Sequence, residues 1–191
     1  MNYVSTLLQS KKTVFTYKDI EILLWIKSRD TVKSLISRLE KTEILKKIYQ
    51  WIYVLPNYNI YELASKIKKN SYISFETVLK SSWIIYQDYW TTLFLASNKS
   101  WEKETNSITF LYKKIKDSIL YNQIGIENKG QYAIASPERA VCDTLYLSPN
   151  YYFDNIEHLN TKKLKEIAQI YNKRVILSIN TLIDDIEHGN A

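Results

Sequence analysis

The chain of 191 residues has little glycine, histidine or cysteine, with three, two and one of them respectively. Three glycines are too few for the glycine-rich loops that cradle phosphates in P-loop and dinucleotide-binding proteins. His158, His188 and Cys142 belong to no Cys/His cluster, so no zinc site is expected, and a single cysteine excludes an internal disulfide. We therefore expect neither a metal nor another cofactor.

The remaining candidates for chemistry have simpler structural explanations. Ser136 precedes Pro137, and this pair is better explained as a helix N-cap and first helical residue than as a nucleophile. The acidic residues Asp184, Asp185 and Glu187 are better explained as the solvated end of a helix than as a catalytic cluster. The sequence therefore predicts that the protein is not an enzyme.

Long hydrophobic runs are also missing. The longest, such as residues 22–26, cover about a quarter of a membrane span. The N-terminus has no basic segment followed by an apolar stretch, as a secretory signal would have. We therefore expect a cytoplasmic protein without a membrane partner.

The positive charge is unevenly distributed along the chain. The net charge is +6, and residues 1–56 contain ten Lys and Arg against five Asp and Glu, whereas residues 57–191 contain sixteen against fifteen. Hydrophobic residues at 46% and charged residues at 24% are typical of a globular protein. The sequence therefore predicts a basic domain at 1–56 and a near-neutral domain at 57–191.

The basic domain is predicted to contain two consecutive helices. Thr16 can cap a helix that runs to about Leu24, with Asp19 completing a weak capping box. Asp30 is expected to cap the next helix. The buried stripe of that second helix follows the i, i+3, i+4, i+7 spacing and consists of Val32, Leu35, Ile36 and Leu39.

The opposite face of the second helix carries hydroxyls and cations, and a hairpin follows it in "LKKIYQ" and "WIYVLP". In the hairpin, Ile48, Trp51 and either Tyr53 or Val54 are expected to return to the core. Helix, short turn, basic helix and hairpin is the order of a winged helix-turn-helix, whose second helix enters the major groove. The residues expected to face double-stranded DNA are Arg29, Thr31, Lys33, Ser34, Ser37, Arg38 and Lys41 on the helix, and Lys46, Lys47 and Gln50 on the hairpin.

Residues 57–191 predict a mixed α/β domain, so the fold class expected for the whole chain is α+β. Ser74 is a candidate cap for a helix in "SYISFETVLKSSWI", and strands are expected in 91–97, 107–113, 119–126 and 130–136. "SPERAVCDTLYL" predicts a helix capped by Ser136, with Arg139 and Asp143 paired along its surface. Two further helices are expected near 161–171 and 175–187.

Three segments, "LKKIYQWIYVLP", "YISFETVLKSSWI" and "YAIASPERAVCDTLYL", resemble the AbiEi-type antitoxins of bacterial abortive-infection systems. The resemblance covers residues 3 to about 150 and is most specific in "IASPERAVCD". It implies a winged helix followed by an antitoxin domain, in a type IV toxin–antitoxin pair whose toxin is a nucleotidyltransferase encoded by a neighbouring gene. It also implies that the protein represses its own operon at inverted repeats, and counteracts the toxin without a stable complex.

Two positions depart from the pattern of that family. Gln50 stands where the family usually has glycine at the hairpin turn, which predicts a looser or wider tip. Ser82 and Trp83 stand where the family has glycine after the "YISFETVLK" helix, which predicts a different local backbone.

An autoregulatory, DNA-binding antitoxin is the leading hypothesis from the sequence. One alternative is a winged helix that binds a protein and acts as an interaction module. The other is a ligand-responsive winged-helix repressor that has no toxin.

Overall fold

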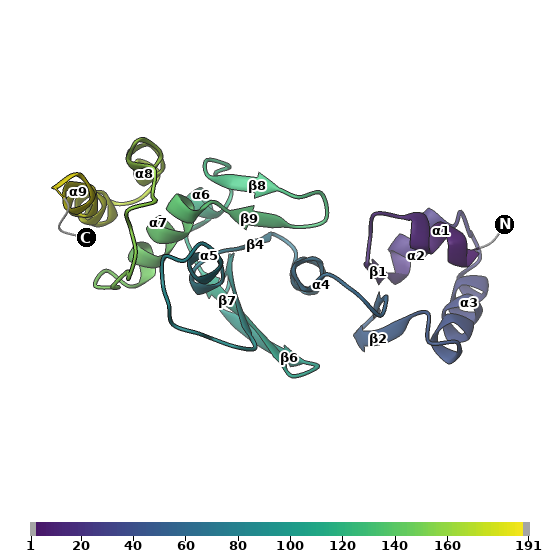
Figure 1. Cartoon of the computed structure of the whole chain (residues 1–191). Coiled ribbons are helices and arrows are strands. Elements are labelled where there is room, and N and C mark those ends of the chain that lie inside the picture. Colours follow the sequence, from purple (N-terminus) through teal and green to yellow (C-terminus); the bar gives the residue numbers. More distant parts are fainter. Residues whose placement is uncertain (1–2, 189–191) are drawn as a thin grey trace. The chain divides into compact units, whose positions relative to one another are not determined.

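The structure is a computed structural model that describes residues 3–188. The fold is mixed α+β, and the chain forms two compact units: unit 1 extends to Lys69 and unit 2 begins at Asn70 (Figure 1). Among residues 3–188, no helix combines the length and the apolar character that a membrane span requires.

Unit 1 packs helices around a small antiparallel sheet whose strand order is β1-β3-β2. Its core contains the predicted stripe Val32, Leu35, Ile36 and Leu39, all buried. The elements are α1 (Tyr3–Gln9), β1 (Val14–Thr16), α2 (Tyr17–Leu23), α3 (Arg29–Lys41), β2 (Lys46–Tyr49), β3 (Ile52–Val54) and α4 (Ile60–Ile67).

The start of α2 is as predicted, and the start of α3 is not. Thr16 and Asp19 form a reciprocal capping box at α2. At α3 the side chain of Ser28 accepts the N–H of Thr31, so Ser28 is the N-cap and Asp30 lies inside the first turn. Asp30 remains favourable there, because a carboxylate complements the positive end of the helix dipole.

The β2–β3 hairpin corrects two expectations. Its turn holds only Gln50 and Trp51, so the tip is tight, and the register shifts between Lys47 and Tyr49. Trp51 is 57% exposed instead of buried, whereas Tyr53 and Val54 both enter the core. The tight turn is possible because Trp51 adopts a φ of 58°, a left-handed conformation that directs the ring outward.

Helix α4 belongs to unit 1, although the sequence favoured a boundary at 56/57. The Glu62 carboxylate accepts hydrogen bonds from the backbone N–H and the hydroxyl of Thr13, at 2.8 and 2.7 Å. Asp19 of α2 forms ion pairs with Lys66 of α4 and with Lys12, both at 2.9 Å. These contacts bridge distant parts of the sequence, which explains why local patterns did not reveal them.

Unit 2 contains a mixed sheet with the strand order β6-β7-β5-β4-β9-β8. Strands β4 and β9 are parallel, as are β5 and β7, and the other neighbouring pairs are antiparallel. The elements are β4 (Ser71–Ile73), α5 (Glu76–Ser81), β5 (Thr92–Ser97), β6 (Trp101–Thr105), β7 (Ile108–Lys114), α6 (Asp117–Leu120), β8 (Ile126–Asn128), β9 (Ala133–Ala135), α7 (Pro137–Leu147), α8 (Thr161–Ala168) and α9 (Lys173–His188).

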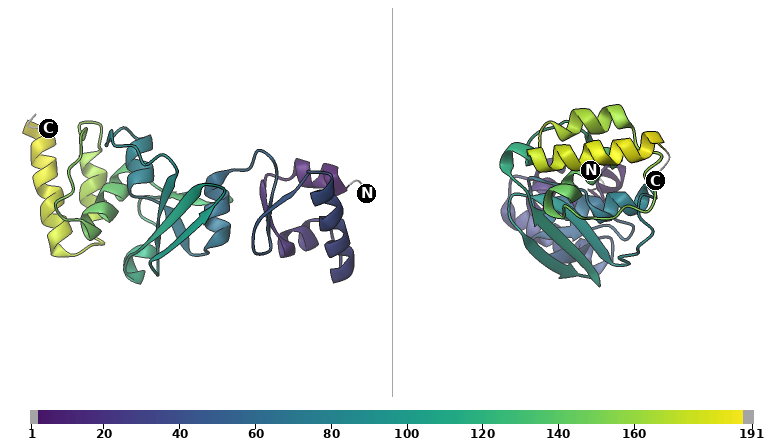
Figure 2. Two further views of the ribbon diagram at one scale, coloured as in Figure 1. Left: turned by 90° about the horizontal axis from the view of Figure 1, so that it is seen from below. Right: turned by 90° about the vertical axis from the view of Figure 1, so that its left-hand side faces the viewer.

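The helices of unit 2 form layers on the sheet. Helix α5 contacts β5 and α7 contacts β9, while α8 and α9 pack on α7 and lie side by side (Figure 2). Ser136 caps α7 with Pro137 at its first position, and the two C-terminal helices form where they were predicted.

Several local expectations in unit 2 are wrong. Ser74 does not cap α5, whose N-cap residue Phe75 makes no side-chain cap bond. Residues 119–126 do not form one strand, because α6 and a turn occupy most of them. Trp83 was expected to impose a different backbone from the glycine that it replaces. Its φ of 58° instead lies in the left-handed region that glycine favours.

The ion pairs of Asp19 make the stability of unit 1 dependent on pH. Burial opposes ionisation of Asp19, but hydrogen bonds from Thr16, Lys66 and Lys12 outweigh it and lower the pKa below the ordinary 3.8. A lowered folded-state pKa contributes stability that is present above pH 3.8 and is lost as the pH falls below it.

We therefore predict that Asp19→Asn destabilises unit 1 by about 1–3 kcal/mol at pH 7 and reduces the loss of stability below pH 4. Denaturant unfolding at a series of pH values measures both effects. Asp30→Asn is the matched control, because the Asp30 side chain is 95% exposed and should contribute little. Equal stability of the two variants would contradict the prediction.

Candidate nucleic-acid interface

Helix α3 presents a continuous polar face to solvent. Its four apolar stripe residues point into the core of unit 1, and this packing fixes the rotation of the helix about its axis. The seven helix residues predicted to contact DNA are therefore all exposed: Arg29, Thr31, Lys33, Ser34, Ser37, Arg38 and Lys41.

The cations on this face are largely available to a ligand. Lys33 lies 3.9 Å from Asp30, and both side chains are exposed, so this pair is weak. Among residues 3–188, no carboxylate lies within ion-pair distance of Arg38, Lys41 or Lys46. The face therefore presents positive charge and hydroxyl groups to solvent.

The hairpin places its predicted residues outward as well. Lys46 and Lys47 lie at the start of β2 and Gln50 lies in the turn, and all three are exposed. The Lys47 ammonium sits 5.6 Å from the centroid of the Trp51 ring, a cation–π distance.

Tyr17 positions both elements, a role that no sequence pattern indicated. Its backbone N–H donates to the carbonyl of Trp51 in the hairpin turn, at 3.2 Å. Its hydroxyl donates to the carbonyl of Arg29 at the start of α3, at 2.6 Å. Partial desolvation and the nearby Glu21 carboxylate raise the pKa of the Tyr17 phenol, which keeps it protonated and able to donate. One residue thus connects α2, α3 and the hairpin.

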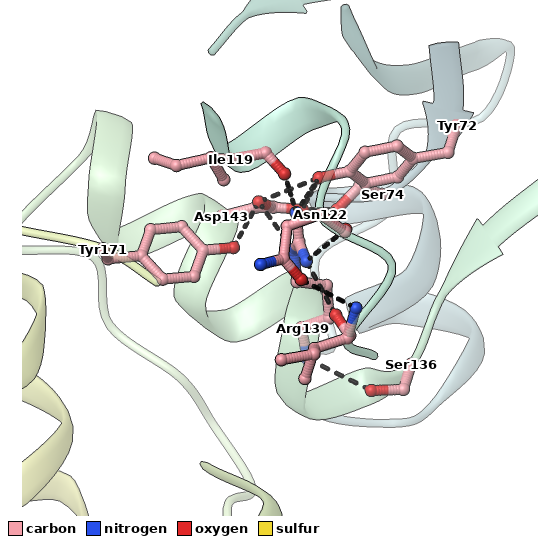
Figure 3. Close-up of polar contacts among 9 residues, drawn as sticks. Tyr72, Ser74, Ile119, Asn122, Ser136, Arg139, Asp143 and Tyr171 are labelled. Atoms are coloured by element: carbon pink, nitrogen blue, oxygen red, sulfur yellow. Dashed lines mark hydrogen bonds and ion pairs between the residues drawn. The ribbon is translucent and has the colours of Figure 1, made fainter. Parts of the chain in front are cut away.

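Unit 2 holds a second polar cluster, centred on the fully buried Asp143 of α7 (Figure 3). The Asp143 carboxylate accepts hydrogen bonds from three hydroxyls: Tyr171 at 2.6 Å, Ser74 at 2.7 Å and Tyr72 at 2.9 Å. Burial and the Asp143 charge raise the pKa of both tyrosines well above 10. They therefore stay protonated and donate at any physiological pH.

Arg139, one turn before Asp143, is also fully buried, with an exposed fraction of 0%. Its Nε donates to Asp143 at 3.3 Å, and one terminal nitrogen donates to the hydroxyl of Tyr72. Burial opposes its charge, but Asp143 outweighs burial and raises the pKa of Arg139. The pair is therefore buried and charged, where a pair on the helix surface was expected.

The guanidinium also binds α6 and the chain between α6 and β8. It donates to the carbonyls of Ile119, Asn122 and Ile124 at 2.7, 3.2 and 2.7 Å. Gly125 follows with a φ of 75°, and a Cβ there would lie 2.9 Å from the Cβ of Arg139. Arg139 thus orders this segment through backbone contacts that no side-chain pattern reveals, and the cluster is structural because solvent does not reach its charged groups.

We predict that Arg139→Met destabilises unit 2 by about 3–5 kcal/mol, because it leaves the Asp143 carboxylate buried without its counter-charge. Denaturant unfolding measures the loss. Arg174→Met is the control, since Arg174 is exposed and its side chain donates, within residues 3–188, to the carbonyl of Tyr146 alone. This variant should change stability by about 0.5 kcal/mol or less. Similar stabilities of the two variants would contradict a central role for Arg139.

No protein-family model and no curated protein matches the chain. Among solved structures, the chain is similar to the Rv2827c protein from Mycobacterium tuberculosis, with a TM-score of 0.56 and 10% sequence identity. The match covers 95% of this chain and 74% of that one. At this identity the likeness concerns the fold alone.

Proposed function

We propose that unit 1 is a winged helix-turn-helix that binds double-stranded DNA, with α3 in the major groove and the β2–β3 hairpin as the wing. The observation that carries the proposal is the exposed face of α3, on which Arg38 and Lys41 have no carboxylate partner among the described residues. Hydroxyls and cations of this kind contact base edges and phosphates in recognition helices.

We expect unit 1 to bind one half-site with a modest, salt-dependent affinity. If unit 1 neutralises about six phosphates, its affinity falls by roughly a thousandfold between 50 and 200 mM salt. A single recognition helix reads only a few base pairs, so useful specificity requires two copies on inverted repeats. The operator we propose is the region upstream of the protein's own gene.

We predict that Arg38→Ala combined with Lys41→Ala weakens binding to this upstream DNA by at least about tenfold and lowers the slope of log affinity against log salt by about two. Fluorescence anisotropy over a range of salt concentrations measures both quantities. The fold should be unchanged, because both side chains are exposed.

Lys162→Ala with Lys165→Ala is the matched control, because it removes two exposed cations from α8 in unit 2. It should retain the affinity and the salt slope of the wild type. The DNA-binding proposal fails if the wild type shows no salt-dependent binding, or if both double variants behave alike.

We further propose that the chain is an autoregulatory antitoxin, with unit 2 as the antitoxic part and a nucleotidyltransferase as the toxin. The support is the resemblance of "YAIASPERAVCDTLYL" to the AbiEi-type antitoxins. Arg139 and Asp143 of this segment form the buried ion pair at the centre of unit 2. We therefore propose that the segment carries the fold of this unit and that the antitoxic surface lies on other residues.

Co-expression with the nucleotidyltransferase encoded by the neighbouring gene tests this role. We predict that the wild type restores growth, and that the Arg38→Ala, Lys41→Ala variant restores it equally while failing to repress its promoter. Growth on plates and a promoter-fusion assay measure the two activities separately. If no such neighbour exists, or if the wild type gives no rescue, a repressor without a toxin is the better description.

A further inference from the structure

Four tryptophans have a backbone conformation that bulky residues rarely adopt. Trp25, Trp51, Trp83 and Trp90 have φ values of 55°, 58°, 58° and 39°, and both glycines in the described part of the chain, Gly125 and Gly130, also have positive φ. Only a few per cent of non-glycine residues have positive φ. At that frequency, four of the chain's five tryptophans would share this region by chance in fewer than about one chain in ten thousand.

The turn after α2 shows why the backbone needs this conformation. The N–H of Ile26 donates to the carbonyl of Glu21 at 3.1 Å, and the N–H of Trp25 donates to the carbonyl of Ile22 at 3.3 Å. These two bonds define a Schellman motif, and Trp25 occupies its left-handed position, where glycine is usual because it has no Cβ.

The end of α5 repeats the same arrangement in unit 2. The N–H of Ile84 donates to the carbonyl of Leu79 at 2.9 Å, and the N–H of Trp83 donates to the carbonyl of Lys80 at 3.1 Å. Trp83 therefore occupies the left-handed position of a second Schellman motif. Trp51 is the second residue of the β2–β3 turn and also has a left-handed conformation, at a place where tight hairpins favour glycine.

The side chains of these tryptophans contribute little packing. Trp25 and Trp90 are 86% and 89% exposed, and Trp83 and Trp51 are 66% and 57% exposed. A large aromatic side chain normally stabilises a fold by burying its surface. These four therefore impose the strain of a Cβ in the left-handed region without the burial that would offset it.

Trp101 is the fifth tryptophan and behaves differently. It lies in β6, where it pairs with Tyr112 of β7, and the two rings stack with centroids 5.5 Å apart. Trp101 has an ordinary strand conformation and an aromatic partner. It therefore serves as the reference for a tryptophan whose ring packs against the protein.

We infer that positions 25, 51, 83 and 90 are glycine positions, and that the cell which makes this protein inserts glycine there. The four residues would then share one codon, which is read as tryptophan in the sequence of 191 residues and as glycine in the cell. Such a difference arises when a stop codon is reassigned. With four more glycines the chain would have seven, closer to an ordinary composition. The exposed tryptophans would then form neither a docking surface nor a base-stacking surface. This inference is independent of the proposed function.

The coding sequence and the mass of the protein from its own cells test the inference directly. We expect one codon at positions 25, 51, 83 and 90 and a different one at Trp101. Peptide mass spectrometry should then find glycine at the first four positions and tryptophan at the fifth. The same codon at all five positions, or tryptophan in the peptides that cover the four, would overturn the inference.

The stabilities of substituted chains provide a second test that does not require the native cells. Trp25→Gly and Trp83→Gly should each raise the ratio of folded to unfolded protein by about twofold to fivefold, since the release of backbone strain exceeds the entropy cost of glycine. Trp25→Ala and Trp83→Ala should give no such gain, because alanine retains the Cβ.

Trp101→Gly is the opposing control and should lower the same ratio by tenfold or more, because it removes the stacked ring and weakens a strand. Denaturant unfolding measures all five variants. If Trp25→Gly and Trp83→Gly lower the ratio as Trp101→Gly does, the rings stabilise the fold and the inference is wrong.

Discussion

The buried ion pair between Arg139 and Asp143 is the interaction on which unit 2 depends. Two opposite charges inside a protein are favourable only when their remaining hydrogen-bonding groups are also satisfied. Here three hydroxyls satisfy the carboxylate, and three backbone carbonyls and a tyrosine hydroxyl satisfy the guanidinium. The partners come from β4 and the residue after it, from α6 and the segment after it, and from the residues before α9. One pair therefore fixes the arrangement of elements that are distant in sequence.

Unit 1 achieves a similar result with weaker and more exposed contacts. The apolar stripe sets the rotation of α3 about its axis. The two hydrogen bonds of Tyr17 fix the positions of the first residue of α3 and of the hairpin turn relative to α2. The cations that we propose for DNA are left outside these contacts. The scaffold and the proposed interface therefore use different residues, so we expect the fold to survive substitution of Arg38 and Lys41.

Apart from the cap of α3, which is Ser28 and not Asp30, periodicity and capping were reliable where the interactions that determine them are local. The stripe of α3, the capping box at Thr16 and the cap at Ser136 all involve residues within two turns of each other. The exposed positions of the candidate DNA contacts followed from the same periodicity. Ser74 illustrates the opposite case: a serine before a helix suggested a cap, but its hydroxyl donates to Asp143, 69 residues away.

The sequence by itself determined the α+β class, the main helices and the basic exposed face of α3, because side-chain spacing along one element decides them. Only the tertiary structure decided that Arg139 and Asp143 are buried, that α4 joins unit 1, and that Tyr17 links α2 to α3 and the hairpin. Those features depend on backbone carbonyls and distant side chains brought together by folding. The left-handed conformation of the four tryptophans was also decided only by the tertiary structure, because the sequence does not show backbone dihedral angles.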